Sequence, residues 1–553
     1  MSKAEVMFPV QTQMGFHFTA DNCIGCHSCE AACSEKNNLP SHIAWRKVGY
    51  VEGGSYPEFT RVNTSMACNH CTDPVCLKGC PTGAYVKYEK YGAVIQDSDI
   101  CFGCQYCTWV CPYNAPAYNP ETGSVSKCNM CVDRLDVGLK PACVSACLGH
   151  ALEFGEVAKM ENERGQALLQ ISGFPDPSLS QPNIRFKQIK ETPDIQYRTD
   201  VEPVNYSNKH SQGGGIKPLA LKPLTWNSLA SNETPLVFFT LLSQMVVGGF
   251  LAFIGYSFFG SPLSPLAPER AMLLTLVGCL FTALALSTGH LGKPQYCYRA
   301  LNNLRYSWVS REILTVGSFF GGLAAYIFFQ TFHLLPSGLL TLLGGGTAMM
   351  GILSLVAMSN CYLIPARPYW NHPHTVISFF GTMTILGLLM TSLFLAYPLI
   401  GGVFSDRQIS FYTGLKQGLL GLISLYLLIR YFSRILFFRY LKNHSGESQA
   451  SFQHLQEAYP GFLKLDWVLQ GFLFLNLVVM LFLPVSGALF GSILISFLTA
   501  AAWQIVDRAI FYNVVIPTTM PGAFFLKNKG FENFARETGL AKDRVVGVLD
   551  QCH

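Results

Sequence analysis

The chain has 553 residues, too many for one ordinary core, so we expect more than one domain. Charged residues make up only 13% of the chain and hydrophobic residues 50%, and the mean hydropathy is +0.27. A soluble protein has about 25% charged residues, so part of this chain is expected to lie in lipid. The formal net charge of +5 is too diffuse to indicate nucleic-acid binding.

Four cysteines in the first third of the chain form its most specific pattern. Cys101, Cys104, Cys107 and Cys111, followed by Pro112, have the spacing C-x2-C-x2-C-x3-C-P. This spacing is typical of chains in which three thiolates bind one [4Fe–4S] cluster and the fourth binds a neighbouring cluster. A structural zinc site needs only four ligands in two short pairs, so the run favours iron–sulfur clusters over zinc.

Disulfides are the other common use of a cysteine-rich segment, mainly in small secreted domains. The regular C-x2-C periodicity argues against them here. Residues 1–21 are mixed polar and apolar without a hydrophobic leader, so we expect no export by a signal of this segment's own. We therefore expect the thiols to bind clusters.

Three further runs repeat the pattern, one with a short insertion and the last with a longer gap between Cys131 and Cys143. The sixteen cysteines of the four runs are Cys23, Cys26, Cys29, Cys33, Cys68, Cys71, Cys76, Cys80, Cys101, Cys104, Cys107, Cys111, Cys128, Cys131, Cys143 and Cys147. Four groups of four match four cubane clusters, and the groups must pair because fourth cysteines are exchanged between clusters. The sequence therefore predicts four [4Fe–4S] clusters.

The stretches ACNHCTDPVCLKGCPTGA (67–84) and ICFGCQYCTWVCPYNAP (100–116) resemble the four-cluster subunit of the dimethyl sulfoxide reductase type, within the complex iron–sulfur molybdoenzymes. The resemblance covers the first third of the chain. It implies that the two inner runs exchange their fourth ligands and that the two outer runs do the same. The implied ligand sets are Cys68, Cys71 and Cys76 with Cys111; Cys101, Cys104 and Cys107 with Cys80; Cys23, Cys26 and Cys29 with Cys147; and Cys128, Cys131 and Cys143 with Cys33.

Two details compare this chain with those relatives. In some of them a Trp replaces one ligand and leaves a three-iron cluster, whereas every ligand position here is Cys. Leu148 follows Cys147 where relatives usually have Pro, which changes a turn and not a ligand. Around the runs we expect small antiparallel hairpins and short helices, as in two fused ferredoxins, with a strand at 92–95.

Eight apolar stretches in the second part of the chain predict membrane spans. They are 235–259, 271–287, 313–332, 339–358, 376–397, 415–429, 467–483 and 489–506. The second, sixth and seventh are shorter than the roughly 20 residues that a helix needs to cross, so we expect them to extend into their flanks. Buried helices of a large soluble domain are the alternative, and so many stretches in series argue against it. The glycine tract 344–346 suits close helix contacts in lipid.

These patterns predict an α+β bis-ferredoxin-like domain followed by an all-α bundle of eight transmembrane helices. We expect the cluster domain at 1–206 and a linker rich in Gly, Ser, Asn, Pro and Lys at 207–232. The membrane anchor is expected at 233–513, and a C-terminal tail at 514–553.

The distribution of basic residues predicts an orientation. An even number of spans places the cluster domain and the tail on one side of the membrane. Loops on that side carry Lys293, Arg299, Arg305, Arg311, Arg367, Arg434, Arg439, Lys442 and Lys464, and the opposite loops carry Arg270, Arg407 and Lys416. The positive-inside rule places the clusters in the cytoplasm, at the inner membrane. The basic loops could instead dock the cluster domain, and relatives can be exported by a leader on their catalytic subunit.

The segment 287–313, between the second and third spans, resembles the membrane anchor of dimethyl sulfoxide reductase, a haem-free quinol-binding bundle. The resemblance implies a quinone site at His290 and Glu312, and we include the neighbouring Arg311 and Trp308. Quinol oxidation releases protons with its electrons, and His and Glu side chains at a lipid edge can accept them. A lone His would more often be an interfacial anchor, but two ionisable groups flanking one loop favour a quinone site.

Haem ligation is the competing use of membrane histidines. The candidates are His290, His333, His372 and His374. No two predicted spans offer facing histidines in mid-membrane, so we predict no haem.

The sequence thus predicts an electron-transfer and membrane-anchor subunit that connects a separate molybdopterin-containing catalytic subunit with menaquinone or ubiquinone. No pterin-binding domain is visible, so we do not expect this chain to turn over the terminal substrate. The same role in a cytoplasm-facing sulfite-oxidising complex is an alternative. An ion-translocating redox module is a weaker one, because it needs mid-span charges and the predicted spans are nearly free of them.

Overall fold

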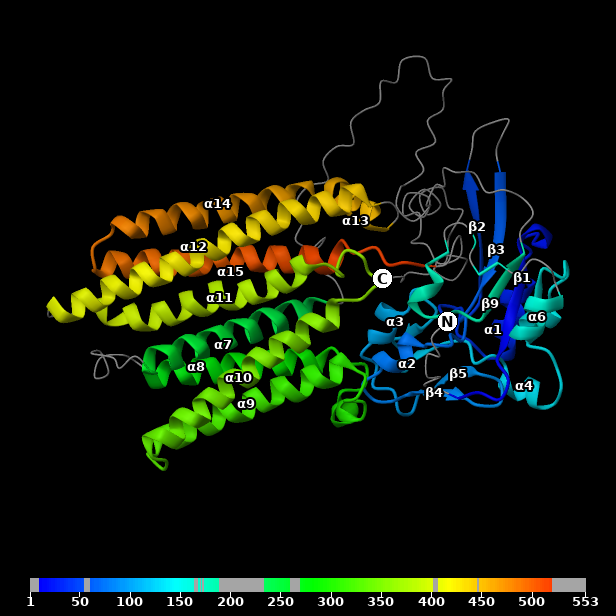
Figure 1. Ribbon diagram of the computed structural model, residues 1–553, viewed down its shortest axis with the longest axis horizontal. Helices are drawn as coiled ribbons and strands as arrows, with labels where there is room; N and C mark the ends of the chain where they lie inside the picture. Colours follow the sequence, from blue (N-terminus) through cyan, green and yellow to red (C-terminus); the bar gives the residue numbers. More distant parts are fainter. Residues whose placement is uncertain are drawn as a thin grey trace, which may run out of the picture.

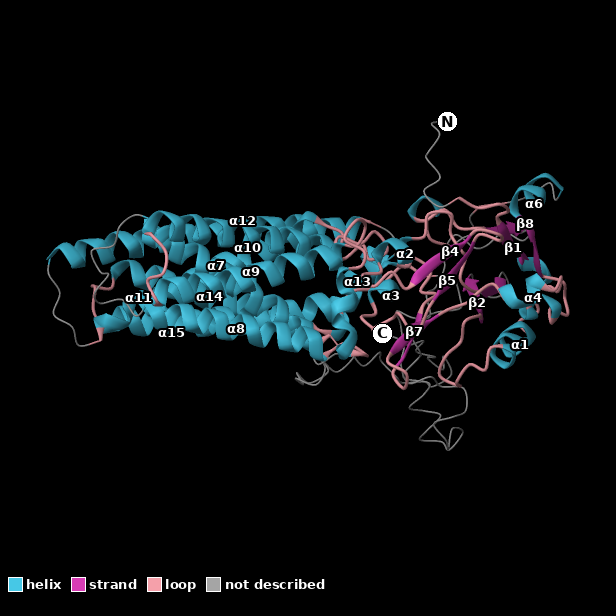
Figure 2. Cartoon of the chain, turned by 90° about the horizontal axis from the view of Figure 1, so that it is seen from below, coloured by secondary structure: helices cyan, strands magenta, loops and turns pink. Residues whose placement is uncertain are grey.

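We describe a computed structural model of the chain, covering residues 9–53, 60–163, 168–169, 171, 174–187, 233–258, 269–400, 406–444 and 447–519. The predicted linker 207–232 and most of the predicted tail, from residue 520 on, lie outside these residues. The molecule is elongated, with a small domain at one end and a bundle of long helices at the other (Figure 1). The strands are confined to the small domain (Figure 2).

A mixed three-stranded sheet closes the small domain. The central strand β1 (Met14–Thr19) pairs antiparallel with β8 (Leu152–Glu156) and parallel with β9 (Ile184–Lys187). Phe16 and Phe18 of β1 alternate along the strand and are both buried in the core of the domain. This sheet was not predicted, because it joins strands that lie far apart in the sequence.

The remaining strands form three antiparallel hairpins, as predicted. They are β2 (Lys47–Gly53) with β3 (Thr60–Met66), β4 (Tyr85–Tyr88) with β5 (Ala93–Gln96), and β6 (Ala117–Asn119) with β7 (Ser124–Ser126). The strand predicted at 92–95 is β5, shifted by one residue.

Most short helices of this domain lie within the cysteine runs. The helices of this domain are α1 (Ser28–Lys36), α2 (Val75–Gly79), α3 (Tyr106–Val110), α4 (Val132–Asp136), α5 (Ala142–Ser145) and α6 (Val157–Glu163), with single turns at Ala20–Asn22 and Pro177–Leu179. Helices α1, α2, α3 and α5 each contain at least one motif cysteine. The prediction of a ferredoxin-like domain of hairpins and short helices is confirmed.

In the part of the chain that the structure describes, eight helices are long and apolar enough to cross a membrane, which confirms the predicted bundle. They are α7 (Thr234–Phe258), α8 (Glu269–Gly289), α9 (Trp308–Thr331), α10 (Ser337–Tyr362), α11 (Pro373–Ala396), α12 (Asp406–Asn443), α14 (Pro460–Phe482) and α15 (Gly487–Asn513). The connections include the short helices η4 (Pro294–Leu301) and η5 (Tyr397–Leu399), and the additional helix α13 (Glu447–Ala458).

Glycines allow some of these helices to pack backbone against backbone. A Cβ atom on Gly248 of α7 would lie 2.0 Å from the carbonyl oxygen of Met383 on α11, so only glycine fits there. The glycines of the predicted tract 344–346 differ in how closely other helices approach them. A Cβ on Gly344 would meet Ile254 of α7 at 2.7 Å, whereas Gly345 and Gly346 face open space. Only the first glycine of the tract makes a close helix contact.

Three helices extend beyond the predicted apolar stretches toward the cluster domain, as expected for the sixth and the seventh stretch. Helices α12, α14 and α15 therefore contain Arg430, Asp466 and Asp507, which the predicted spans ended just short of. All three side chains are buried or nearly so. The predicted stretches themselves carry almost no charged residues, and these three lie directly outside them, packed between helices.

The chain returns to the cluster domain after the last span. The Thr518 hydroxyl donates a hydrogen bond to the carbonyl oxygen of Pro112, directly after the last cysteine of the central run (3.1 Å). Residues 514–519, which follow α15, thus lie on the same side of the bundle as the cluster domain, as an even number of spans requires.

Candidate electron-transfer and quinone site

The sixteen motif cysteines lie in four thiol sets, whose members are close enough to influence one another's ionisation. Set 1 is Cys23, Cys26, Cys29 and Cys147; set 2 is Cys33, Cys128, Cys131 and Cys143; set 3 is Cys68, Cys71, Cys76 and Cys111; set 4 is Cys80, Cys101, Cys104 and Cys107. This grouping follows the ligand sets that the resemblance implies, in which three thiols come from one run and the fourth from another.

The local backbone curls around each set. His27, Gln105 and Met130 adopt left-handed conformations within the C-x2-C spacings (φ 60°, 60° and 64°). Such turns point backbone N–H groups toward the sulfur atoms. The amide of Gly103 donates to Cys101 Sγ (3.4 Å), and the amide of Leu152 donates to Cys147 Sγ (3.3 Å). Hydrogen bonds to cluster sulfurs are a main way in which proteins set cluster potentials.

The spacing of the thiols fits a cubane better than a single ion. Among the described residues, no three His, Cys, Asp or Glu side chains converge closely enough to hold one metal ion. A [4Fe–4S] cube instead takes one thiolate at each of four irons, so its ligands stand further apart. The four thiols of set 3 line one cavity together with Lys127. The donor set and its geometry therefore fit four-iron clusters.

Burial makes these thiols poor acids on their own. It raises the pKa of Cys111 to about 11 and that of Cys33 to about 12. Metal ligation requires thiolates, so metal binding must drive their deprotonation. Folding of this domain is therefore expected to depend on its metal.

Two buried cations lie among the thiols, and the sequence pattern did not reveal them. Arg46 donates to the Ser65 carbonyl oxygen (3.2 Å). Lys127 donates to the carbonyl oxygens of Val94 and Cys128. Burial by itself lowers the pKa of Lys127, but the neighbouring thiols of sets 2 and 3 outweigh it and raise that pKa. Both cations therefore stay charged beside the thiol sets.

Set 4 lies against the membrane bundle. Helix α3, which carries Cys107, places Tyr106 and Trp109 in the apolar core of the bundle, and Cys104 packs against the same core. In Figure 1, α2 and α3 are on the side of the small domain that faces the long helices. Set 4 therefore lies next to the bundle.

The loop after α8 holds this contact through glycines. A Cβ atom on Gly292 would lie 2.2 Å from the carbonyl oxygen of Gly123, and one on Gly103 would lie 3.0 Å from Gly292 Cα. The backbone amide of Lys293 donates to the Phe102 carbonyl oxygen (3.0 Å). The loop thus packs backbone to backbone against the central cysteine run.

Polar side chains of the bundle loops complete the docking. Asn303 donates to the Cys80 carbonyl oxygen (2.8 Å), and Lys293 Nζ donates to that of Ser98 (2.9 Å). Arg299 donates to the Asp99 carbonyl oxygen (2.6 Å) and Arg367 to that of Trp109 (3.3 Å). Lys293, Arg299 and Arg367, which were used above to predict the orientation in the membrane, therefore bind the cluster domain.

The two principal predicted quinone residues lie at this end of the bundle, with different partners. The His290 ring nitrogen Nδ1 lies 2.5 Å from the Ser287 carbonyl oxygen, and burial lowers the pKa of His290. Glu312 is buried, with Oε2 3.3 Å from Cys361 Sγ. The Tyr106 hydroxyl donates to the Cys361 carbonyl oxygen (3.0 Å). Cys361 thus connects Glu312 to the helix that carries Cys107, which sequence reasoning had missed.

Arg311 and Trp308 interact with each other at the start of α9. The Arg311 guanidinium lies 4.4 Å from the centre of the Trp308 ring and donates to the carbonyl oxygens of Leu304 and Arg305 (3.1 and 2.7 Å). These contacts fix the end of the loop. The structure gives Arg311 a positioning role in this loop.

The other membrane histidines are dispersed. His333 is exposed after α9, at the end of the bundle remote from the clusters. His374 Nδ1 lies 2.9 Å from the Ser433 hydroxyl, and His372 Nδ1 accepts from the backbone amide of His374 (3.1 Å). These contacts give the last two histidines local hydrogen-bonding roles.

Four thiol sets in a ferredoxin-like domain, docked on a bundle of eight apolar helices, define a membrane-anchored iron–sulfur electron-transfer subunit. Residues 60–157 match the 4Fe-4S dicluster domain family, and residues 229–514 match the DMSO reductase anchor subunit (DmsC) family. This polypeptide belongs to the dimethyl sulfoxide reductase family, as a fusion of its iron–sulfur subunit with its membrane anchor.

Similarity to curated proteins is concentrated in the cluster domain. The sequence is 39% identical over 184 residues to a subunit of the anaerobic dimethyl sulfoxide reductase of Escherichia coli (strain K12), a match that covers 32% of this chain and 89% of that relative. It is 33% identical over 184 residues to a sulfite dehydrogenase subunit of Allochromatium vinosum, covering 30% of this chain and 77% of that protein. The formate dehydrogenase iron-sulfur subunit of Haemophilus influenzae is 38% identical over 180 residues, with 29% and 57% covered.

Proposed function

We propose that this chain relays electrons through four [4Fe–4S] clusters between a molybdopterin-containing catalytic subunit and quinone in the bilayer. The observation that carries the proposal is the continuous series of thiol sets that ends against the bundle. The motif cysteines would hold the clusters, which supply one-electron redox chemistry when bound. The chain itself would place them in order and keep them out of water.

Contacts between the sets support one order along this series. Arg46 lies close to both Cys29 of set 1 and Cys143 of set 2. Cys128 of set 2 lies close to Cys68 of set 3. The Tyr85 hydroxyl lies close to thiols of sets 3 and 4. We therefore infer the order set 1, set 2, set 3, set 4, bundle.

Set 1 would face the catalytic subunit. Cys26 is exposed, and a hydrogen bond with Ser28 lowers its pKa. Two large apolar side chains near this set are exposed, Ile24 by 68% and Leu148 by 73%. An exposed apolar surface beside a redox centre suits a protein partner that exchanges electrons there.

Quinone would react where set 4 meets the bundle. His290 is neutral at pH 7 because burial lowers its pKa, so its ring can accept a hydrogen bond or a proton from quinol. The Glu312 carboxyl lies on the inner side of the same loop and can take part in proton exchange. Oxidation of one quinol would break two O–H bonds, release two protons and pass two electrons, one at a time, to the cluster that set 4 would hold; reduction would be the reverse.

Variants of the two residues test the location of this site. His290→Phe and Glu312→Gln should slow cluster reduction by quinol in isolated membranes by at least about tenfold, since proton transfer by a positioned side chain contributes about 10²–10⁴-fold. Reduction by an artificial dye should be unchanged. His333→Phe, at the opposite end of the bundle, is the matched control and should react normally. Normal quinol kinetics in both test variants would place the site elsewhere.

The clusters would lie on the cytoplasmic side of the inner membrane. This orientation is supported by cations on the cluster side that remain exposed, which are Arg305, Arg439, Lys442 and Lys464. A reporter that is active only in the periplasm, fused after His553, should stay silent. Strong periplasmic activity would reverse the orientation.

A sulfite-oxidising complex is the second candidate, favoured by the 33% identity to a sulfite dehydrogenase subunit. Electrons would then run from the catalytic subunit toward quinone, along the same series of clusters. Purifying the complex and identifying the reaction of its molybdenum subunit distinguishes the two.

A further inference from the structure

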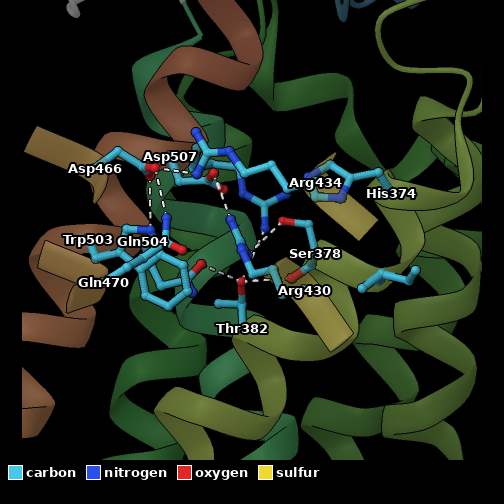
Figure 3. A network of polar contacts seen from close by, with 12 residues as sticks. His374, Ser378, Thr382, Arg430, Arg434, Asp466, Gln470, Trp503, Gln504 and Asp507 are labelled. Atoms are coloured by element: carbon cyan, nitrogen blue, oxygen red, sulfur yellow. Dashed lines mark hydrogen bonds and ion pairs between the residues drawn. The ribbon is translucent and has the colours of Figure 1, made fainter. Parts of the chain in front are cut away.

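A network of buried polar side chains crosses the cluster-proximal half of the bundle, between α11, α12, α14 and α15 (Figure 3). Arg430 forms an ion pair with Asp507 (2.6 Å), and Arg434 forms one with Asp466. Asp466 also accepts hydrogen bonds from Trp503 and Gln470 (2.9 and 2.8 Å), among the residues drawn. Two arginines and two aspartates thus neutralise each other inside the membrane domain.

Arg508 adds a third buried guanidinium to this region. Within the described residues, no carboxylate lies within ion-pair distance of it. Its Nη2 donates to Gln244 Oε1 (3.1 Å) and Thr382 Oγ1 (3.4 Å), and Thr382 in turn donates to Gln504 Oε1 (2.8 Å). We call Gln244, Thr382, Gln504 and Arg508 the Arg508 chamber.

The chamber has more hydrogen-bond donors than acceptors. Arg508 Nε and Nη1 and Gln504 Nε2 are buried and have no acceptor in the described part of the protein. A buried donor without a partner costs several kcal/mol in a membrane interior, so such groups are normally satisfied by ordered water. The donors therefore point to water molecules inside the chamber.

A pair of tyrosines connects this chamber with Glu312. The hydroxyls of Tyr362 and Tyr512 are 2.5 Å apart, and both lie in the electrostatic field of Glu312 and of Arg508. Tyr362 directly follows Cys361, whose thiol contacts Glu312. Two exchangeable hydroxyls thus lie near both the carboxyl behind the proposed quinone site and Arg508 of the chamber.

The network also leads back toward the cluster-side surface. Asp507 directly precedes Arg508 on α15 and pairs with Arg430, which donates to Ser378 (3.1 Å). His374, half-buried at the start of α11, lies close to both Arg430 and Asp507. The polar route therefore has an inner end at Glu312 and an outer end at His374.

We propose that this route is a proton path: Tyr362, Tyr512 and water in the Arg508 chamber carry the protons of the quinone reaction between Glu312 and the cluster-side surface. The inference rests on the proposed quinone reaction at Glu312. When quinol is oxidised, its electrons go to set 4 and each proton passes from Glu312 along the hydroxyls to chamber water. In quinone reduction the protons move inward along the same groups. Arg508 is a positioning residue that holds the water and touches no quinone.

Packing alone does not need the tyrosine hydroxyls. The Tyr362 ring contacts the rings of Trp370, Phe379 and Phe511 at centroid distances of 5.4–5.5 Å. The ring of Tyr512 lies 5.4 Å from that of Phe511. Tyr→Phe changes at these positions keep the aromatic cluster and remove only the hydroxyl group.

The experiment uses the full-length chain in nanodiscs, with reduced menadione, a naphthoquinol, as the electron donor. Tyr512→Phe should slow quinol-driven bleaching of the clusters about tenfold, the lower range for loss of a proton-transfer group, and should change its solvent deuterium isotope effect. Reduction by dithionite and the binding of menadione should stay at native values. Tyr412→Phe is the matched control, because its buried hydroxyl donates to the Leu395 carbonyl oxygen (2.9 Å) at the remote end of the bundle.

The outcomes separate the path from the quinone site. Tyr362→Phe removes the other hydroxyl of the pair and should reproduce the effect, and it replaces Tyr512→Phe if that variant assembles poorly. Native rates and native isotope effects in both variants would overturn the path while leaving the quinone reaction intact. A native chain that does not react with naphthoquinol at all would overturn the proposed function, and the path with it.

Discussion

Both ends of this molecule bury cations, but they neutralise them differently. In the cluster domain, Arg46 and Lys127 lie among the thiols of sets 1, 2 and 3. In the bundle, Arg430 and Arg434 are paired with aspartates of the same chain. The negative charge of the first region arises only when the cysteines become thiolates, whereas that of the second is always present.

This difference indicates which part of the protein is expected to depend on its cofactor for folding. A domain whose counter-charges form on metal binding is expected to fold with the metal. A bundle whose ion pairs are complete within the chain is expected to be stable without it. Arg508 departs from the second pattern, since it is buried in the bundle without a paired carboxylate among the described residues, and this is why we assign it to a hydrated path.

The largest expected effect tests this dependence directly. Iron-depleted chain should lose the protease resistance of residues 9–187, because the buried thiols and cations lose their charge partners. A fragment beginning near α7 should remain protected in the membrane. Limited proteolysis followed by mass spectrometry measures both. Equal protease resistance of the cluster domain with and without iron would contradict the expected difference between the two regions.

Removing one member of a bundle ion pair should have the next largest effect. Asp466→Leu leaves Arg434 buried without its partner and should destabilise the bundle by about 3–5 kcal/mol. The double variant with Arg434→Met should recover most of this loss, since an apolar pair of similar volume replaces the ions. Thermal unfolding in detergent measures both. Asp406→Leu, at the exposed start of α12, is the control and should have little effect.

Adding one methyl group at the contact between the cluster domain and the bundle should weaken that contact. Gly292→Ala places a Cβ against the carbonyl oxygen of Gly123, and overpacking of this kind costs about 1–3 kcal/mol. We expect slower quinol-driven cluster reduction and easier cleavage of the loop by protease. Gly289→Ala lies three residues earlier and meets no atom within 4 Å, so it should behave as the native chain. Identical behaviour of the two variants would contradict the docking described here.

The smallest expected effect sharpens the role of the buried cations. Lys127→Met removes a positive charge beside thiol sets 2 and 3, which makes reduction of their clusters harder. Their midpoint potentials should fall by about tens of millivolts, a small part of the range that local charge and hydrogen bonding produce. Potentiometric titration followed by electron paramagnetic resonance measures the shift. Lys90→Met removes an exposed lysine and should leave the potentials unchanged.

Local patterns were enough to predict much of this architecture. The cysteine runs and the eight apolar stretches are contiguous in sequence, so their spacing alone predicts a ferredoxin-like domain and a membrane bundle. Long-range packing was not visible in the same way. The sheet of β1, β8 and β9 joins distant strands, and Arg46 gives no local signal of its burial among thiols contributed by several runs.

The candidate quinone site shows the same limit. His290 and Glu312 were found because they flank one loop. The partner of Glu312 comes from elsewhere, because Cys361 lies on α10. Charged residues such as Asp466 and Asp507 were placed at span ends, because the sequence does not show that an arginine on another helix neutralises each of them.

The most direct test of the account mixes the purified, oxidised chain, without its catalytic partner, with a naphthoquinol under anaerobic conditions. Cluster absorbance is followed on the millisecond to second scale, and dithionite then gives the full extent of reduction. The account predicts that quinol bleaches the clusters of the isolated chain, because the thiol sets and the quinone site are on one polypeptide. Full bleaching by dithionite with none by quinol would contradict it.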